Sequence, residues 1–234
     1  MNSETTRQRL NREQSREQTR ERLLDASRTV FVQKGFALTS VEDIAATAGY
    51  TRGAFYSNFT DKTELFVELL RRECENIDRE FHHLFQAPLA DVVELQEKIA
   101  NYYSGLYGDG AFSVLWMEAK IVAVRDEKFR ATLSLFLEER RAQIAEFVET
   151  YARLTNTQSG TSAHHIAIGL MALCEGINIA HRCDPQNVDD KTAEEILSWF
   201  LKTTLAMPQQ AKQSPAAKVV KTKTAARRVA SKSN

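Results

Sequence analysis

The sequence has few of the residues that interrupt helices or cross-link chains. Its 234 residues include only 4 Pro, 9 Gly and 3 Cys. So little Pro and Gly beside 43% hydrophobic residues favours a helical protein. Cys74, Cys174 and Cys183 are odd in number and lack a CxxC spacing. They therefore predict free thiols in a reducing cytoplasm, not a disulfide framework or a zinc site.

Signals for export, membrane insertion and catalysis are also missing. The first residues are polar and charged, unlike a signal peptide. The most apolar stretch, residues 166–180, is interrupted by Gly169, Glu175 and Asn178, so we expect it to be too short to span a bilayer. No GxSxG, HExxH or phosphate-binding glycine loop occurs. We therefore expect a soluble, cytoplasmic protein that is not an enzyme and needs no metal or cofactor.

The net charge of zero hides an uneven distribution of charge. Residues 206–234 contain seven basic residues and no acidic one, which leaves residues 1–205 of this 31-basic, 31-acidic chain with a net charge of −7. The segment also lacks an apolar face, so the composition predicts a disordered basic tail. Such a tail either adds affinity for DNA phosphates without sequence preference or only keeps the protein soluble.

Residues 39–59 have the pattern of two short helices joined by a tight turn. Thr39 followed by Glu42 predicts a capping box at the first helix. Gly49 suits the turn, because it adopts positive φ without strain, and Thr51 can cap the second helix. The apolar face of the first helix comprises Val41, Ile44, Ala45 and Ala48.

The second helix combines an apolar side, Phe55 and Phe59, with a polar side. Gly53 allows the backbone to approach a partner closely. The polar side offers a guanidinium, an amide and hydroxyls, from Thr51, Arg52, Tyr56, Ser57 and Asn58. This arrangement predicts a helix-turn-helix motif whose second helix enters the major groove of DNA. The alternative is an ordinary helical hairpin.

The same stretch carries a family resemblance. The segments Thr39-Ser-Val-x-x-Ile-Ala, Ala48-Gly49 and Arg52-Gly-Ala-Phe-Tyr-Ser-Asn-Phe59, with Lys62 and Glu64-Leu65-Phe66, closely resemble the TetR family (TetR/AcrR type) of bacterial transcriptional regulators over about residues 17–77. The resemblance implies an all-α homodimer that is usually a repressor released by a small molecule. Tyr50 departs from the aliphatic residue more common in the family, and its hydroxyl could reach a phosphate. The predicted DNA-binding set is Thr39, Ser40, Tyr50, Thr51, Arg52, Gly53, Tyr56, Ser57, Asn58 and Lys62.

The rest of the chain divides into segments around this motif. Residues 1–16 are expected to form a polar, basic arm or a frayed helix end, and residues 17–77 a three-helix DNA-binding domain. The first firm helix spans about 17–34 and ends at Gly35, and Asp61 with Glu64 is expected to cap the last one. Residues 78–207 are expected to form a helical ligand-binding and dimerisation bundle, with helices near 92–106, 112–124 and 127–154 and two more before 206. Residues 208–234 are expected to form the disordered tail.

The last two helices carry a pattern typical of close helix packing. Small residues repeat in the first, and an apolar stripe follows the second, so the pair either completes the core or forms a subunit interface. The resemblance implies an interface with a second copy, through Gly169, Ala172, Gly176, Ala180, Ile196, Leu197, Phe200 and Leu201. A dimer would place its recognition helices about 34–36 Å apart and select a near-palindromic operator.

Several residues are candidates for a ligand pocket, although core packing is the alternative for all of them. They are Tyr102, Tyr103, Phe112, Trp116, Met171, Cys174 and Asn178. The leading interpretation is thus a nucleoid-associated repressor of bacterial genes that responds to an unidentified small molecule. An effector-independent or architectural DNA-binding protein that uses its basic tail is the second. An enzyme would need a catalytic cluster that the sequence does not show.

Overall fold

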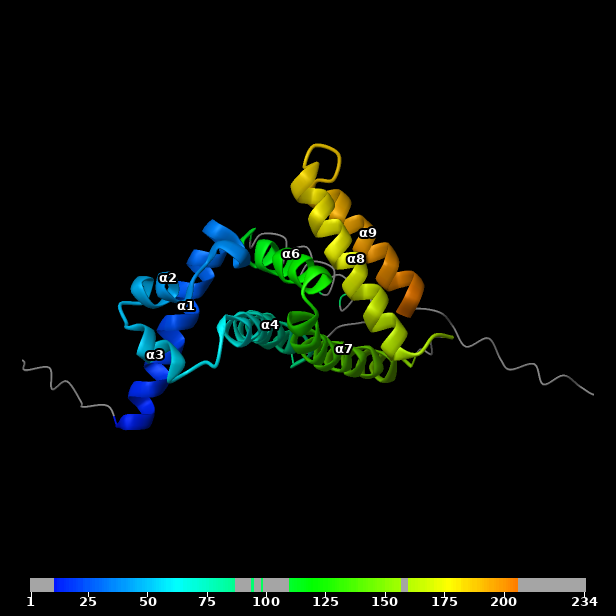
Figure 1. The fold of residues 1–234 in the computed structure, drawn as a ribbon. Coiled ribbons are helices and arrows are strands. Elements are labelled where there is room, and N and C mark those ends of the chain that lie inside the picture. The colour runs from blue at the N-terminus through cyan, green and yellow to red at the C-terminus, as the bar shows by residue number, and fades with distance from the viewer. Residues whose placement is uncertain (1–10, 87–93, 95–97, 99–109, 157–159, 206–234) are drawn as a thin grey trace, which may run out of the picture.

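The computed structural model describes residues 11–86, 94, 98, 110–156 and 160–205, and throughout these ranges the regular elements are helices (Figure 1). The predicted all-α class is confirmed. The described helices are α1 (Arg12–Leu38), α2 (Val41–Thr47), α3 (Arg52–Tyr56), α4 (Lys62–Gln86), α6 (Gly110–Arg125), α7 (Glu127–Thr155), α8 (Ala163–Cys183) and α9 (Asp190–Leu205). The helix predicted near 92–106 and the basic tail lie outside the described residues.

Helix α1 begins earlier and ends later than its apolar pattern predicts. Asn11 is its N-cap, with a reciprocal capping box to Gln14, so residues 12–16 form the helix extension, one of the two alternatives that the sequence left open. At Gly35 the backbone takes φ 74° and ψ 167°, which kinks the helix instead of ending it.

The first turn of α2 is capped one residue later than predicted. Ser40, not Thr39, is the N-cap, and it exchanges hydrogen bonds with Asp43 instead of Glu42. Thr39 is 2% exposed and donates its hydroxyl proton to the Gly35 carbonyl at 2.7 Å, so it closes α1.

The turn and cap between α2 and α3 follow the prediction. Gly49 has φ 75°, and the Thr51 hydroxyl accepts a hydrogen bond from the Ala54 N–H. Helix α3 is shorter than expected, because it ends at Tyr56 with Ser57 as its C-cap. Together, α1 to α4 form what we call the DNA-reading unit, residues 11–86.

Helix α4 belongs to the DNA-reading unit and also packs against α6 and α7. Asp61 accepts the Glu64 N–H at 2.9 Å, as predicted for its start. Phe31, Phe36 and Phe66 of the DNA-reading unit pack with Phe129 of α7, at ring separations of 4.6–5.9 Å. One continuous apolar core therefore extends from α1 through α4 to α6 and α7.

Helices α6 to α9 form the body, and their predicted positions are confirmed. Helix α8 packs against α7 and α9. Its 21 residues are long and apolar enough to cross a membrane by length and composition alone, and they extend beyond the stretch 166–180 on which the expectation rested. Its Glu175 nonetheless forms an ion pair with Lys120 of α6, which is the packing of a helix inside a protein bundle.

Candidate DNA-reading face and ligand cavity

The short helices α2 and α3 present a polar surface. Tyr56 is 48% exposed although it is aromatic, and it lies one turn after Arg52. Tyr50 is half-buried in the turn before α3. Ser40, Thr51, Arg52, Gly53, Tyr56 and Ser57, all from the predicted DNA-binding set, are exposed. Hydroxyls, a guanidinium and accessible backbone are the groups that proteins direct at phosphates and base edges.

Arg52 is oriented by neighbours on both helices. Its guanidinium lies 2.8 Å from the Glu42 carboxylate on α2 and donates to the Tyr56 hydroxyl at 3.4 Å. The hydroxyl of Tyr56, and after it the charge of Glu42, raises the pKa of Arg52 above its ordinary value. The side chain is therefore a fully charged fork held across the α2–α3 surface.

Two members of the predicted DNA-binding set turn inward. Thr39 is buried, as described above, so its side chain is removed from the face. Asn58 donates its side-chain N–H to the Ala54 carbonyl at 2.8 Å, and its Oδ1 is buried with no hydrogen-bond partner. Asn58 thus closes the end of α3, a use of Asn that competes with binding a ligand.

Lys62 has partners inside the protein. Its ammonium donates to the carbonyls of Phe36 at 2.6 Å and Thr39 at 2.7 Å, and it lies 4.2 Å from the centre of the Phe36 ring. Burial lowers its pKa. The sequence suggested a phosphate partner because a cation is unfavourable at a helix start, but these carbonyls already explain its position. A phosphate contact by Lys62 stays a prediction.

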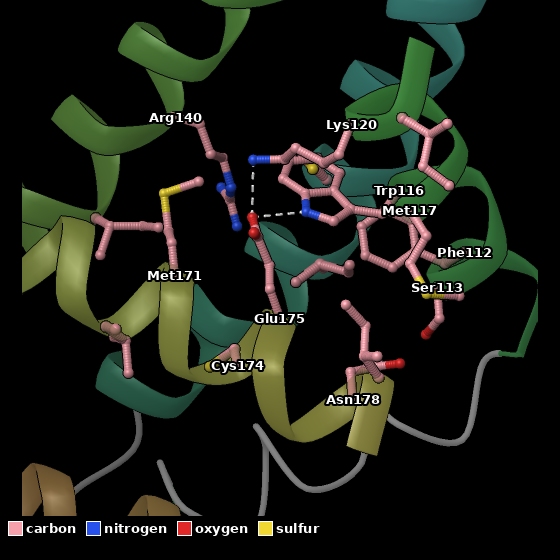
Figure 2. A pocket seen from close by; sticks show the side chains of 16 residues that line it. Phe112, Ser113, Trp116, Met117, Lys120, Arg140, Met171, Cys174, Glu175 and Asn178 are labelled. Atoms are coloured by element: carbon pink, nitrogen blue, oxygen red, sulfur yellow. Dashed lines mark hydrogen bonds and ion pairs between the residues drawn. The ribbon is translucent and has the colours of Figure 1, made fainter. Parts of the chain in front are cut away.

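A cavity of about 510 Å³ lies between α4, α6, α7 and α8 (Figure 2). Its lining includes five of the seven residues proposed for a pocket: Phe112, Trp116, Met171, Cys174 and Asn178. Tyr102 and Tyr103 lie outside the described residues. The walls are mainly apolar, with Ile77, Met117, Ile121, Ile144, Leu170 and Ile179 adding to the aromatic rings.

Three charged residues of the cavity are absent from the sequence-based set. Glu175 of α8 accepts the Trp116 indole N–H at 2.8 Å and pairs with Lys120 at 3.0 Å, as the dashed lines in Figure 2 show. Arg140 of α7 pairs with Asp78 of α4. These partners are far apart in sequence, so no local motif reveals them.

The cysteines are free thiols, as predicted. Cys74 and Cys174 both line the cavity. Burial raises the pKa of the Cys74 thiol to about 12, so it stays protonated at neutral pH. Cys74 therefore acts there as an apolar wall.

The predicted interface residues divide between the inside and the surface of the α8–α9 pair. Leu197 is 0% exposed within the chain, and a Cβ at Gly169 would lie 3.5 Å from Phe200, so this part packs α8 on α9. Ala180 is half-buried. The side chain of Leu201 is outside the described residues. The exposed apolar residues, which we call the α8–α9 face, are Ile168, Ala172, Gly176, Ile179, Ile196 and Trp199.

Comparisons with known families match both parts of the chain. The family described as "Bacterial regulatory proteins, tetR family" matches residues 23–69, which carry the helix-turn-helix. The family described as "BetI-type transcriptional repressor, C-terminal" matches residues 95–206. The two matches cover the DNA-reading motif and the body in the order that the structure has them.

Individual relatives are similar over parts of their length. The HTH-type transcriptional regulator AcrR of Shigella flexneri is 42% identical over 64 residues, which is 27% of this chain and 30% of AcrR. The HTH-type transcriptional repressor KstR2 of Rhodococcus jostii is 25% identical over 110 residues, 47% of this chain and 54% of KstR2. The chain thus matches about half or less of the length of these two curated relatives.

Solved structures share the fold over most of the chain. A transcriptional regulator from Saccharomonospora viridis in complex with choline has a TM-score of 0.61 and 19% identity, covering 80% of this chain and 96% of that one. A complex of SmeT, the repressor of the Stenotrophomonas maltophilia multidrug efflux pump SmeDEF, with triclosan has a TM-score of 0.61 and 22% identity, covering 80% and 91%. At this identity the likeness concerns the fold.

Proposed function

The chain belongs to the TetR family of bacterial regulatory proteins, and from that premise we propose that it is a homodimeric transcriptional repressor that a small molecule releases from a near-palindromic operator. The observation that carries this proposal is the exposed polar surface of α2 and α3. Ser40, Thr51, Arg52 and Tyr56 lie on it within one short motif. A recognition helix with a charged fork and hydroxyls is suited to the major groove and its flanking phosphates.

The cavity supports the small-molecule part of the proposal. A volume of about 510 Å³ lies in the usual range for small-molecule sites. The bound choline and triclosan in the two related structures are small molecules of different chemistry. For this chain, apolar walls with three charged residues, Lys120, Arg140 and Glu175, suit a largely apolar molecule that also carries a polar group.

The α8–α9 face supports the dimer. Trp199 is 65% exposed on α9, and the position of a Cβ on Gly176 is open, so a partner helix could approach α8 closely. Burying such residues against a second copy is the ordinary reason for an exposed apolar stripe. Two copies related by a two-fold axis would present two recognition helices to two half-sites.

Selection of binding sites from random duplex DNA tests the proposal. The intact protein is compared with Arg52→Ala, with a chain ending at Met207, and with Arg130→Ala as a control for an exposed arginine of the body. We expect a near-palindromic site for the intact, truncated and control proteins and loss of that site in Arg52→Ala. A bidentate arginine–base contact contributes about 1–3 kcal/mol of discrimination.

Two outcomes would contradict the proposal. If no motif is enriched and truncation abolishes binding, the basic segment binds DNA and an architectural function is favoured instead. If Arg52→Ala selects the same site as the intact protein, α3 is not the reader. Small molecules can be screened afterwards by their ability to release the selected duplex.

A further inference from the structure

Helix α6 has one side in the cavity and another side against the DNA-reading unit. Phe112, Trp116 and Lys120, spaced four residues apart, line the cavity. Leu115 and Ala119 lie in the core that α6 shares with α1, and the two helices pack together. A displacement of α6 by a molecule in the cavity would therefore act on α1 directly.

Glu118 forms a polar contact between these two helices. Its Oε1 accepts the N–H of Phe36 at 2.9 Å. In an unbroken helix that N–H would bond to the carbonyl four residues earlier, but the positive φ of Gly35 interrupts the repeat. A Cβ on residue 35 would lie 3.1 Å from the same carboxylate oxygen, so Gly35 also leaves the space for Glu118.

The end of α1 is held from two sides. Glu118 accepts a hydrogen bond from the N–H of Phe36, and Lys62 of α4 donates hydrogen bonds to the carbonyls of Phe36 and Thr39. Ser40, the cap of α2, follows Thr39 directly. The direction in which the chain enters α2, and hence the position of α3, depends on these two contacts.

On the cavity side, α6 is tied to α8 close to Glu118. Trp116 contacts the Glu175 carboxylate at 2.8 Å and Lys120 contacts it at 3.0 Å, as Figure 2 shows. In the sequence, Trp116 lies two residues before Glu118 and Lys120 two residues after it. Trp116, Lys120 and Glu175 all line the cavity, so a molecule bound there can contact this cluster. Apolar contacts can slide, whereas a hydrogen bond is directional, so the Glu118–Phe36 bond transmits a movement of α6 most strictly.

We propose that Glu118 is a positioning residue that couples the cavity, through the bond to the Phe36 N–H, to the orientation of α2 and α3. The proposal rests on the proposed function, and it names the contact by which cavity and DNA surface affect each other. Coupling between two sites is reciprocal. We therefore expect DNA bound at α3 to change the surroundings of Trp116 in the cavity, which can be measured without knowing the small molecule.

Fluorescence of Trp116 gives the readout. The chain has 2 Trp, so Trp199→Phe leaves Trp116 as the single tryptophan. Acrylamide quenching is measured with and without the selected duplex, using a scrambled duplex as the control. In this background we expect the selected duplex, and not the scrambled one, to change the quenching constant of Trp116.

Three further variants of the Trp199→Phe protein test the role of Glu118. Glu118→Met keeps the size of the side chain but removes the acceptor, and we expect the DNA-dependent change at Trp116 to be lost while the duplex still binds. Glu118→Gln keeps an acceptor and should restore the change. Val124→Ala alters an exposed residue of the same helix and should leave the change intact.

The outcomes separate this inference from the proposed function. If the intact protein binds no selected duplex, the proposed function fails; if only Trp199→Phe loses binding, the exchange has disturbed the α8–α9 face and Trp199→Tyr is used in its place. If the single-tryptophan protein binds the duplex but Trp116 does not respond, or responds equally in Glu118→Met, the role of Glu118 is overturned. If Glu118→Met does not fold, Glu118→Ala is used, and a full response in that variant would also overturn it.

Discussion

The DNA-reading unit and the α8–α9 pair bury their apolar residues differently. Phe31, Phe55 and Phe66 are almost completely enclosed within one chain. On α8 and α9, Ile179 is 42% and Trp199 65% exposed. The first region completes its core within one chain, together with α6 and α7, whereas the second has apolar surface left over. The difference shows where the fold is self-sufficient and where we expect a second copy to complete it.

The largest expected effect comes from opening the enclosed core. Phe66→Ala should lower the free energy of unfolding by about 3–5 kcal/mol, because it removes a buried ring and leaves a hole. Met171 lines the existing cavity, so Met171→Ala should lower the free energy of unfolding by less. Urea denaturation measures both. Equal losses would mean that the two regions are packed alike.

The next effect concerns the incomplete region. Trp199→Glu should weaken dimer association by about 2 kcal/mol or more, since a buried interfacial Trp is typically a dominant contact. Leu135→Glu, on an equally exposed apolar residue of α7, is the matched control and should leave the dimer intact. Sedimentation velocity distinguishes the two. A monomer in both variants, or in neither, would argue against the α8–α9 face as the interface.

Helix caps sharpen the comparison at a smaller scale. Ser40→Ala should cost about 1 kcal/mol of stability, and Ser162→Ala, at the start of α8, a similar amount, because each removes the acceptor for a free helix N–H. Thermal unfolding measures the loss. DNA binding should weaken only in Ser40→Ala, since only that cap belongs to the DNA-reading unit. Weakened binding in both variants would show a general effect of stability.

The smallest effect is expected in the stability of the protein at acid pH. Lys34, and then Ser40, hold the pKa of Asp43 below its usual range, and Thr192 does the same for Asp189 at the start of α9. A carboxyl group whose pKa is lower in the folded state stabilises the fold at pH values above its unfolded pKa of about 3.9. This stabilisation is lost as the pH falls through the lowered pKa of the folded state. The stability difference between the intact protein and Asp43→Asn, or Asp189→Asn, should therefore shrink below about pH 4. A constant difference would contradict this.

Local patterns predicted the helices well, and their limits have physical causes. Thr39 with Glu42 and Ser40 with Asp43 are two overlapping capping boxes, and burial of Thr39 decides between them. The hydroxyl of Ser57, like the amide of Asn58, was assigned to DNA because it is polar, yet both bond to carbonyls within α3. Short polar side chains after a helix often turn back in this way.

The charged part of the cavity could not be predicted from the sequence. Trp116 and Glu175 are 59 positions apart, and Glu118 and Phe36 are 82 apart. Such pairs arise from tertiary packing and have no periodic signal along the chain. Of the aromatic residues proposed for a pocket, Phe112 and Trp116 line the cavity, and their binding of a ligand stays a prediction.

The kink at Gly35 also restricts which substitutions and which domain exchanges with related proteins this chain can accept. A side chain at position 35 would meet both a strained backbone and the Glu118 carboxylate oxygen at 3.1 Å, and a change on α6 would relieve only the second. Residues 35, 36, 62 and 118 therefore form one epistatic set that spans both parts of the chain. A chimaera that joins a foreign DNA-reading unit to this body should bring the matching residue at position 118 with it.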